Sequence, residues 1–168
     1  MKDFIEIERK YIIEMPKDDL LSSLPCQKRS SIVQIYLASH DGVTRRIRSR
    51  KYESGIRYFE TVKRRIDKIS AYEDEKEISK SEFNEKSKEI KEGTTPIIKD
   101  RIEFSYSGKV FEIDIYPAWS NTAIMEVELN SAEEEVKIPD FIKIIKEVTG
   151  ERKYSNAAMS ENFPAEVK

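Results

Sequence analysis

The chain of 168 residues has little of the residue types on which common catalytic and structural arrangements depend. It contains one cysteine, Cys26, so an internal disulfide is excluded and a reducing compartment is indicated. It also contains one histidine, His40, beside Asp41-Gly42 in a turn-like stretch. Without a Ser–His or Cys–His arrangement, the sequence offers no candidate for nucleophilic catalysis. We expect Cys26 to fill space and His40 to face solvent.

Long apolar segments are missing as well. No run approaches the roughly 20 consecutive apolar residues that span a bilayer, and no apolar signal segment follows Met1. These observations predict a cytoplasmic protein that has no membrane partner.

Charge, in contrast, is abundant and balanced. Charged residues make up 37% of the chain, yet the net charge is only -2. A nucleic-acid-binding protein would instead show a basic domain or a basic face, so no nucleic-acid partner is indicated. The length suits one domain with a real core, which we predict to span residues 1–168.

The charged residues alternate with apolar ones along strand-like segments. In Glu6-Ile7-Glu8-Arg9-Lys10, an extended chain puts Glu6, Glu8 and Lys10 on one face and Ile7 on the other. The same alternation recurs in later segments, each largely of one sign: Arg46, Arg48 and Arg50; Thr61, Lys63 and Arg65; Glu75 and Glu77; Lys99, Arg101 and Glu103; Glu112 and Asp114; Glu126 and Glu128. A solvated surface normally mixes both signs, so this sorting indicates an enclosure lined with charge.

Eight segments have the alternation of strands: residues 3–14, 31–38, 43–51, 56–65, 71–78, 96–107, 109–117 and 122–130. Apolar spacing predicts helices at 17–23, 80–92 and 139–148, and an irregular tail at 151–168. The fold predicted is mainly β: a closed eight-stranded antiparallel barrel with a few helices around it. Closure removes exposed strand edges, and outer helices cover the apolar faces while the charges line the interior.

The ordered motifs resemble those of the CYTH domain, or triphosphate tunnel metalloenzyme, family, and most closely its short bacterial inorganic triphosphatases. In chain order, the matching residues are Glu6, Glu8 and Lys10 (E-x-E-x-K), Arg46 and Arg48 (R-x-R), Thr61 and Lys63 (T-x-K), Glu75 and Glu77 (E-x-E), Lys99 and Arg101 (K-x-R), Asp114, Glu126 and Glu128 (a second E-x-E), and a closing motif at 147–156. The resemblance covers nearly the whole chain.

The resemblance implies a tunnel that binds a small triphosphate together with Mg2+ or Mn2+. It implies that phosphate is bound by Lys10, Arg46, Arg48, Lys63, Arg65, Lys99, Arg101 and Lys153. It implies metal ligation and catalysis by Glu6, Glu8, Glu126 and Glu128, with Lys10 also catalytic. Glu75, Glu77 and Asp114 are expected either to join the metal ligands or to hold basic residues through salt bridges.

The activity implied is hydrolysis of inorganic tripolyphosphate to pyrophosphate and phosphate. Three alternatives remain open: a class IV adenylyl cyclase, a thiamine triphosphatase, and a module that binds polyphosphate or nucleotide without catalysis. The intact E-x-E pairs disfavour the last. A homodimer is also left open.

Two positions depart from the pattern. Many short bacterial members carry an arginine two residues before the first E-x-E, where this chain has Glu73. This change could remove a phosphate contact, with Arg64 or Arg65 as substitutes. A tryptophan is common before the closing motif, where this chain has Asp140-Phe141-Ile142; its single tryptophan is Trp119.

Overall fold

A computed structural model describes residues 5–25 and 27–168. Cys26, expected to fill space, lies outside the described residues. The strands are β1 (Ile5–Glu14), β2 (Lys28–Leu37), β3 (Thr44–Tyr52), β4 (Gly55–Arg65), β5 (Ser70–Ile78), β6 (Ile97–Tyr106), β7 (Lys109–Ile115), β8 (Thr122–Glu128) and β9 (Ile144–Glu147). The helices are α1 (Asp18–Ser23), α2 (Lys80–Lys86) and α3 (Asn156–Glu161), with short 3-10 turns at Ser87–Glu89 and Arg152–Tyr154.

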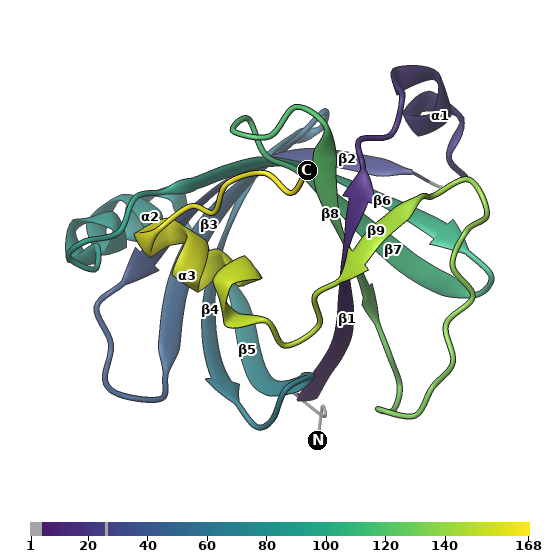
Figure 1. Cartoon of the computed structure of the whole chain (residues 1–168). Helices are drawn as coiled ribbons and strands as arrows, with labels where there is room; N and C mark the ends of the chain where they lie inside the picture. The colour runs from purple at the N-terminus through teal and green to yellow at the C-terminus, as the bar shows by residue number, and fades with distance from the viewer. Residues whose placement is uncertain (1–4, 26) are drawn as a thin grey trace.

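Eight of these strands form a closed antiparallel barrel, as predicted (Figure 1). Their order is β5-β4-β3-β2-β6-β7-β8-β1, and β1 pairs back onto β5 from Ile5↔Tyr72 to Ile7↔Ser70. This closing contact is short because β5 reaches only the first residues of β1. The barrel therefore has no free edge at Ile5–Ile7, but one side of the later part of β1 needs another partner.

The segment predicted as a helix at 139–148 supplies that partner, so the helix prediction is wrong. Residues Ile144–Glu147 form β9, which pairs antiparallel with Tyr11–Ile13 of β1. The backbone N–H of Val148 also donates to the Lys10 carbonyl at 2.8 Å. Unpaired backbone groups on β1 and the β-branched residues of this segment favour the extended form over the helix that the spacing indicated.

Two other predicted elements differ in extent. The helix predicted at 80–92 ends at Lys86, although Ser79 and Glu82 form a capping box at its N-terminus. Beyond its 3-10 turn the chain pairs with the end of β2, where the N–H of Lys91 donates to the Tyr36 carbonyl at 2.9 Å. The tail, predicted irregular, contains α3, whose cap is the Ser155 hydroxyl accepting from the Ala158 N–H.

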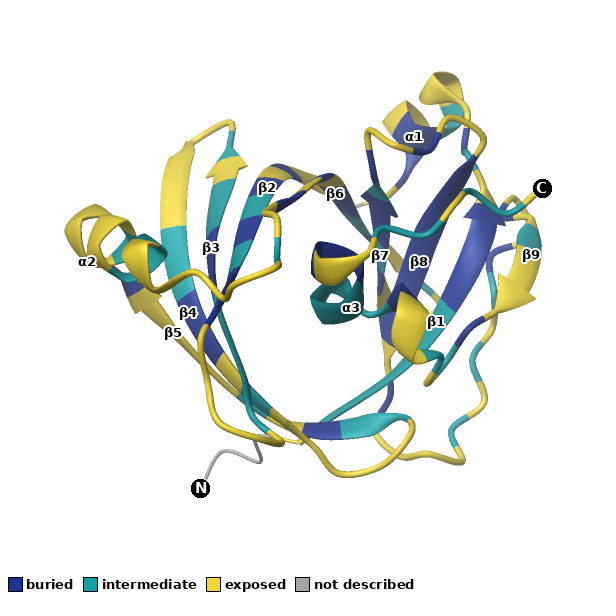
Figure 2. Ribbon diagram, turned by 60° about the vertical axis from the view of Figure 1, so that its left-hand side comes forward, coloured by how far each residue is buried: buried dark blue, intermediate teal, exposed yellow. Residues whose placement is uncertain are grey.

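Apolar side chains cover the outside of the barrel. One cluster joins outer residues of β1, β6, β7 and β8, such as Phe104 and Met125, to Leu21 of α1, Leu24 and Ile142. A second joins Ile47 and Ile78 to Phe83 of α2. Figure 2 shows α1 and α2 on the outside of the wall. The apolar faces thus point outward, and the charged faces are free to line the interior.

A third apolar cluster fills one end of the interior. Inner residues Ile12, Tyr116 and Ile124 pack there with Tyr154 and Met159 of the tail. Figure 2 shows α3 within the opening of the barrel. The Trp119 ring stacks edge-on against Phe163, and its indole N–H donates to the Pro164 carbonyl at 3.1 Å. The tail therefore closes off the apolar end and leaves the charged stretch as a cavity. None of the helices in the described part of the chain has the length and apolar character that a membrane crossing requires.

Candidate active site

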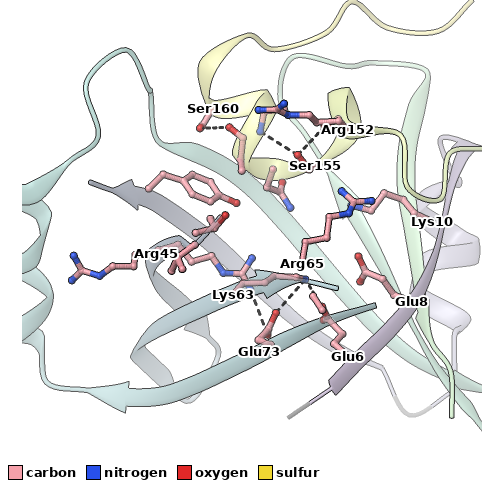
Figure 3. A pocket seen from close by; sticks show the side chains of 18 of the residues that line it. Glu6, Glu8, Lys10, Arg45, Lys63, Arg65, Glu73, Arg152, Ser155 and Ser160 are labelled. Carbon is pink, nitrogen blue, oxygen red and sulfur yellow. Dashed lines mark hydrogen bonds and ion pairs between the residues drawn. The ribbon is translucent and has the colours of Figure 1, made fainter. Parts of the chain in front are cut away.

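A cavity of about 900 Å³ lies within the barrel. Its lining combines acidic and basic side chains from seven of the eight barrel strands; those that matter for the chemistry are Glu6, Glu8, Lys10, Arg46, Arg48, Arg50, Lys63, Arg65, Glu73, Glu75, Arg101, Glu112, Glu126 and Glu128. Figure 3 shows Glu6, Glu8 and Lys10 of β1 around one space with Lys63 of β4 and Glu73 of β5. The alternation seen in the sequence thus brings these charges together.

Three arginines of β3 form a basic wall. Arg46, Arg48 and Arg50 each have one carboxylate partner, at 3.7 Å from Glu73, 2.7 Å from Glu75 and 3.0 Å from Glu103 respectively. The Nε atom of each guanidinium is buried and has no hydrogen-bond partner among the described residues. Buried donors normally have partners, so three adjacent free ones indicate a place for an anion.

The opposite wall is acidic. β3 and β8 are four strands apart in both directions around the ring, so Glu126 and Glu128 of β8 stand across the barrel from the arginines. On β1, Glu8 is the direct cross-strand partner of Glu128, and Lys10 that of Glu126. Burial, with repulsion from Glu126, raises the pKa of Glu8 to about 8. Burial and Glu6 raise the pKa of Glu128 as well. These carboxylates are therefore short of positive charge.

Carboxylates that lack counter-charge are suited to a hard divalent cation, which takes oxygen ligands. Glu8 and Glu128 fit this role best, with Glu6 beside them on β1. Glu126 is already engaged, at 2.9 Å from Lys10 and 3.7 Å from Arg101. Burial opposes its ionisation, but Lys10 and Arg101 outweigh burial and hold the pKa of Glu126 below its usual range. In the described residues, no group of three acidic, histidine or cysteine side chains is already drawn together as a metal cage.

Asp114 lies behind the lining rather than in it. It is fully buried, with Lys99 at 2.6 Å and Arg101 at 2.7 Å, and Lys99 itself is only 1% exposed. Burial disfavours its charge, yet Arg101 and Lys99 keep the pKa of Asp114 below its usual range. This arrangement gives Asp114 the salt-bridge role of the two that the sequence left open, and it places Lys99 beneath the cavity floor.

Replacing Asp114 with asparagine should therefore cost stability. The substitution leaves Lys99 and Arg101 buried with their shared carboxylate gone, which typically costs about 3–5 kcal/mol. Urea unfolding measures the loss. Asp100→Asn is the control, because Asp100 lies on the same strand pair but is exposed. Equal stability of the two variants would contradict this role for Asp114.

The remaining predicted residues lie in different places. Glu75 lines the cavity and accepts from Arg48 and from Thr61 Oγ1 at 2.8 Å, whereas Glu77 is exposed and pairs with Arg57 outside the lining. Arg65 lines the cavity with its guanidinium tied to the Asp67 and Lys68 carbonyls. Arg64 does not line it.

Lys153 is replaced in the cavity by its neighbour. The Lys153 ammonium lies 4.9 Å from the centre of the Tyr154 ring and is exposed, while Arg152 lines the cavity (Figure 3). The 3-10 turn at Arg152–Tyr154 decides this, and nothing in the sequence distinguishes the two basic residues. Arg50 and Glu112 also line the cavity. Both belong to the alternating pattern, so their signal was present in the sequence.

The barrel and its charge-lined cavity define the triphosphate tunnel, or CYTH, fold. Among solved structures, the inorganic triphosphatase NE1496 aligns with a TM-score of 0.60 and 25% identity, over 95% of this chain and 97% of its own. A conserved hypothetical protein from Pyrococcus furiosus aligns with a TM-score of 0.58 and 22% identity, over 76% and 82% of the two chains. An adenylyl-cyclase-like protein from Hippeastrum, HpAC1, for which a dominant triphosphatase activity is described, aligns at 0.51 and 15%, over 76% and 81%.

The chain therefore has the triphosphate tunnel fold and resembles the inorganic triphosphatase. No protein-family model matches it, and no curated protein matches it.

Proposed function

We propose that this protein is a divalent-metal-dependent triphosphatase and that its substrate is inorganic tripolyphosphate. The observation that carries the proposal is the pairing of two walls: three buried guanidinium Nε donors on β3 without partners in the described residues, across from Glu8 and Glu128 on β1 and β8. A linear anion with bound cations neutralises both walls at once. The likeness to the inorganic triphosphatase NE1496 supports the same reaction class.

The basic residues would bind the phosphate chain and stabilise the pyrophosphate leaving group. Arg46 and Arg48 offer forked donors, which suit phosphate oxygens. Lys10 is held in place between Glu126 and the Tyr154 carbonyl, 3.3 Å from its Nζ. Positive charge held in fixed positions stabilises the charge that develops as the terminal P–O bond breaks.

Glu6, Glu8 and Glu128 are the residues that would hold the cation, with Glu126 joining if Lys10 moves to the phosphate. A bound Mg2+ or Mn2+ supplies Lewis-acid polarisation of the phosphate and lowers the pKa of a bound water. The same carboxylates would orient the attacking water in line with the terminal phosphorus. No protein nucleophile is needed, which agrees with the lack of a Ser–His or Cys–His pair in the sequence.

The residues that line the cavity favour a bare triphosphate as the substrate over a nucleotide. In the described part of the chain, Tyr36 is the only phenylalanine, tyrosine or tryptophan of the lining, and its hydroxyl already accepts from Gln34 Nε2 at 2.6 Å. Lining residues outside the strands include His40, Asp41, Thr94 and Asn156. His40 is exposed, as expected from its turn. An adenine ring binds best against a stacking surface. Apart from Tyr36, the apolar part of the described lining consists of scattered aliphatic residues such as Val43, Ile69 and Val148.

Tripolyphosphate is accordingly expected to be hydrolysed with a higher kcat/KM than ATP or thiamine triphosphate. A phosphate-release assay compares these three and pyrophosphate, each with Mg2+ and with Mn2+ at one pH. Cyclic AMP and pyrophosphate accumulating from ATP, with little phosphate from tripolyphosphate, would instead identify a cyclase. Tight binding of tripolyphosphate without turnover would identify a binding module.

A further inference from the structure

Glu73 lies against two cations of the cavity at once. Its Oε1 is 3.7 Å from Arg46 Nη2, and its Oε2 is 3.3 Å from Lys63 Nζ. All three side chains line the cavity, and Figure 3 shows Lys63 between Glu73 and Glu6. A carboxylate and a phosphate make the same charge-assisted hydrogen bonds to a guanidinium or an ammonium. Glu73 therefore stands where a phosphate oxygen would bind.

The contact between Glu73 and Arg46 differs from the one beside it. Glu75 holds Arg48 at 2.7 Å and also accepts from Thr61 at 2.8 Å, so Glu75 is fixed from two sides. Glu73 has no such hydroxyl partner among the described residues, and its distance to Arg46 is a full ångström longer. Glu75 is thus built to position an arginine, whereas Glu73 is held loosely enough to be displaced.

A phosphate that reaches Arg46 meets the charge of Glu73. The Glu73 side chain is 18% exposed and that of Arg46 is 15% exposed, so water screens this repulsion poorly. Glu6 adds a second carboxylate on the other side of Lys63. An anion with its full charge is therefore repelled at this point, while one partly neutralised by a divalent cation is repelled less.

We propose that Glu73 is a specificity-determining residue: its carboxylate competes with phosphate for Arg46 and Lys63, and it thereby selects metal-complexed triphosphate over the free anion. This inference rests on the proposed function, since it takes the cavity to be the triphosphate site. Glu73 is not assigned a catalytic role.

The test measures tripolyphosphate binding to the whole protein with and without Mg2+. In excess chelator, calorimetric titration gives Kd for wild type, Glu73→Gln and Asp74→Asn; with Mg2+, KM comes from initial rates. Glu73→Gln keeps the size of the side chain and removes its charge. Asp74→Asn removes the same charge one residue away, where the side chain is exposed and, by strand alternation, points out of the barrel. We expect Glu73→Gln to bind the metal-free anion about tenfold more tightly, which corresponds to about 1.4 kcal/mol.

With Mg2+ the gain should shrink to less than about twofold, and Asp74→Asn should match wild type in both conditions. Glu73→Ala should repeat the gain, which excludes a new contact made by the glutamine amide. Unchanged or weaker binding of metal-free tripolyphosphate by Glu73→Gln would show that Glu73 positions Arg46 and Lys63 and does not compete with phosphate for them. An equal gain in the presence of Mg2+ would show that Glu73 does not select the metal complex over the free anion. Either result overturns the inference. If folded wild type binds no tripolyphosphate with or without Mg2+, the proposed function itself fails.

Discussion

Replacing Arg48 with alanine is expected to lower kcat/KM for tripolyphosphate by roughly 10²–10³-fold, the usual cost of removing one fixed donor from developing negative charge. Arg48 is 7% exposed, is held by Glu75 at 2.7 Å, and keeps a buried Nε without a partner in the described residues. Its position in the middle of the basic wall makes it hard for neighbours to replace. The kcat/KM of Arg48→Lys should lie between those of wild type and Arg48→Ala, because lysine keeps the positive charge but lacks the forked donors of the guanidinium.

Arg57→Ala is the matched control for this prediction. Arg57 lies on the adjacent strand β4 and pairs with Glu77 at 2.6 Å, but it is exposed and outside the cavity lining. The Arg57→Ala variant should retain a near-normal kcat/KM for tripolyphosphate. If Arg48→Ala and Arg57→Ala behave alike in steady-state phosphate release, the β3 arginines do not form the phosphate-binding wall.

Replacing Glu8 with glutamine is expected to have opposite effects on activity and on stability. Turnover should fall at least about 100-fold, since the variant loses a carboxylate proposed to hold the metal. The metal-free protein should become more stable, because burial and repulsion from Glu126 disfavour the charge that is removed. Each kcal/mol gained raises Tm by about 2–4 °C in a chain of this size.

The pH dependence of that stability gain has a definite sign. The pKa of Glu8 in the folded protein is about 8, above its ordinary value of 4.5. Folding therefore favours the protonated form, and wild type loses stability relative to Glu8→Gln as the pH rises from about 4.5 to about 8. Thermal melts in chelator across this range measure the difference. Equal melting temperatures at pH 8, with normal turnover, would show that Glu8 belongs to no acidic metal site.

The barrel could be predicted from the sequence because its pattern is redundant. Alternation such as Arg46-Ile47-Arg48 recurs on nearly every strand, and a one-residue error in register would put charges into the outer apolar clusters. The region 139–148 carried no such redundancy. Phe141, Ile144, Ile145 and Val148 match helical spacing, but the open side of β1 at Tyr11–Ile13 decides their conformation. This side of β1 is left without a partner by the way in which the barrel closes, and a local sequence pattern does not indicate how a barrel closes.

The residues of the cavity also fall into two groups: those whose place follows from local strand alternation, and those whose place depends on the tertiary fold. Strand alternation put Glu8, Arg48 and Lys63 into the lining, as the sequence indicated. It could not separate a lining residue from one behind the lining. Lys99 was expected to bind phosphate but is buried against Asp114, for which the salt bridge was one of the two roles that the sequence left open. Where the chain leaves the strands the pattern stops, and no signal in the sequence indicates that Arg152 lines the cavity and Lys153 does not.

The most direct test of this account is the dependence of tripolyphosphate hydrolysis on a divalent cation. Phosphate release from purified protein is measured with Mg2+ or Mn2+, in excess chelator, and after the cation is restored. We predict turnover with the cation, none above background in chelator, and full recovery on restoration, because in the proposed mechanism the acidic side chains of the cavity hold the cation that activates the attacking water. Hydrolysis at full rate in chelator, or none under any of these conditions by folded protein, would contradict the account.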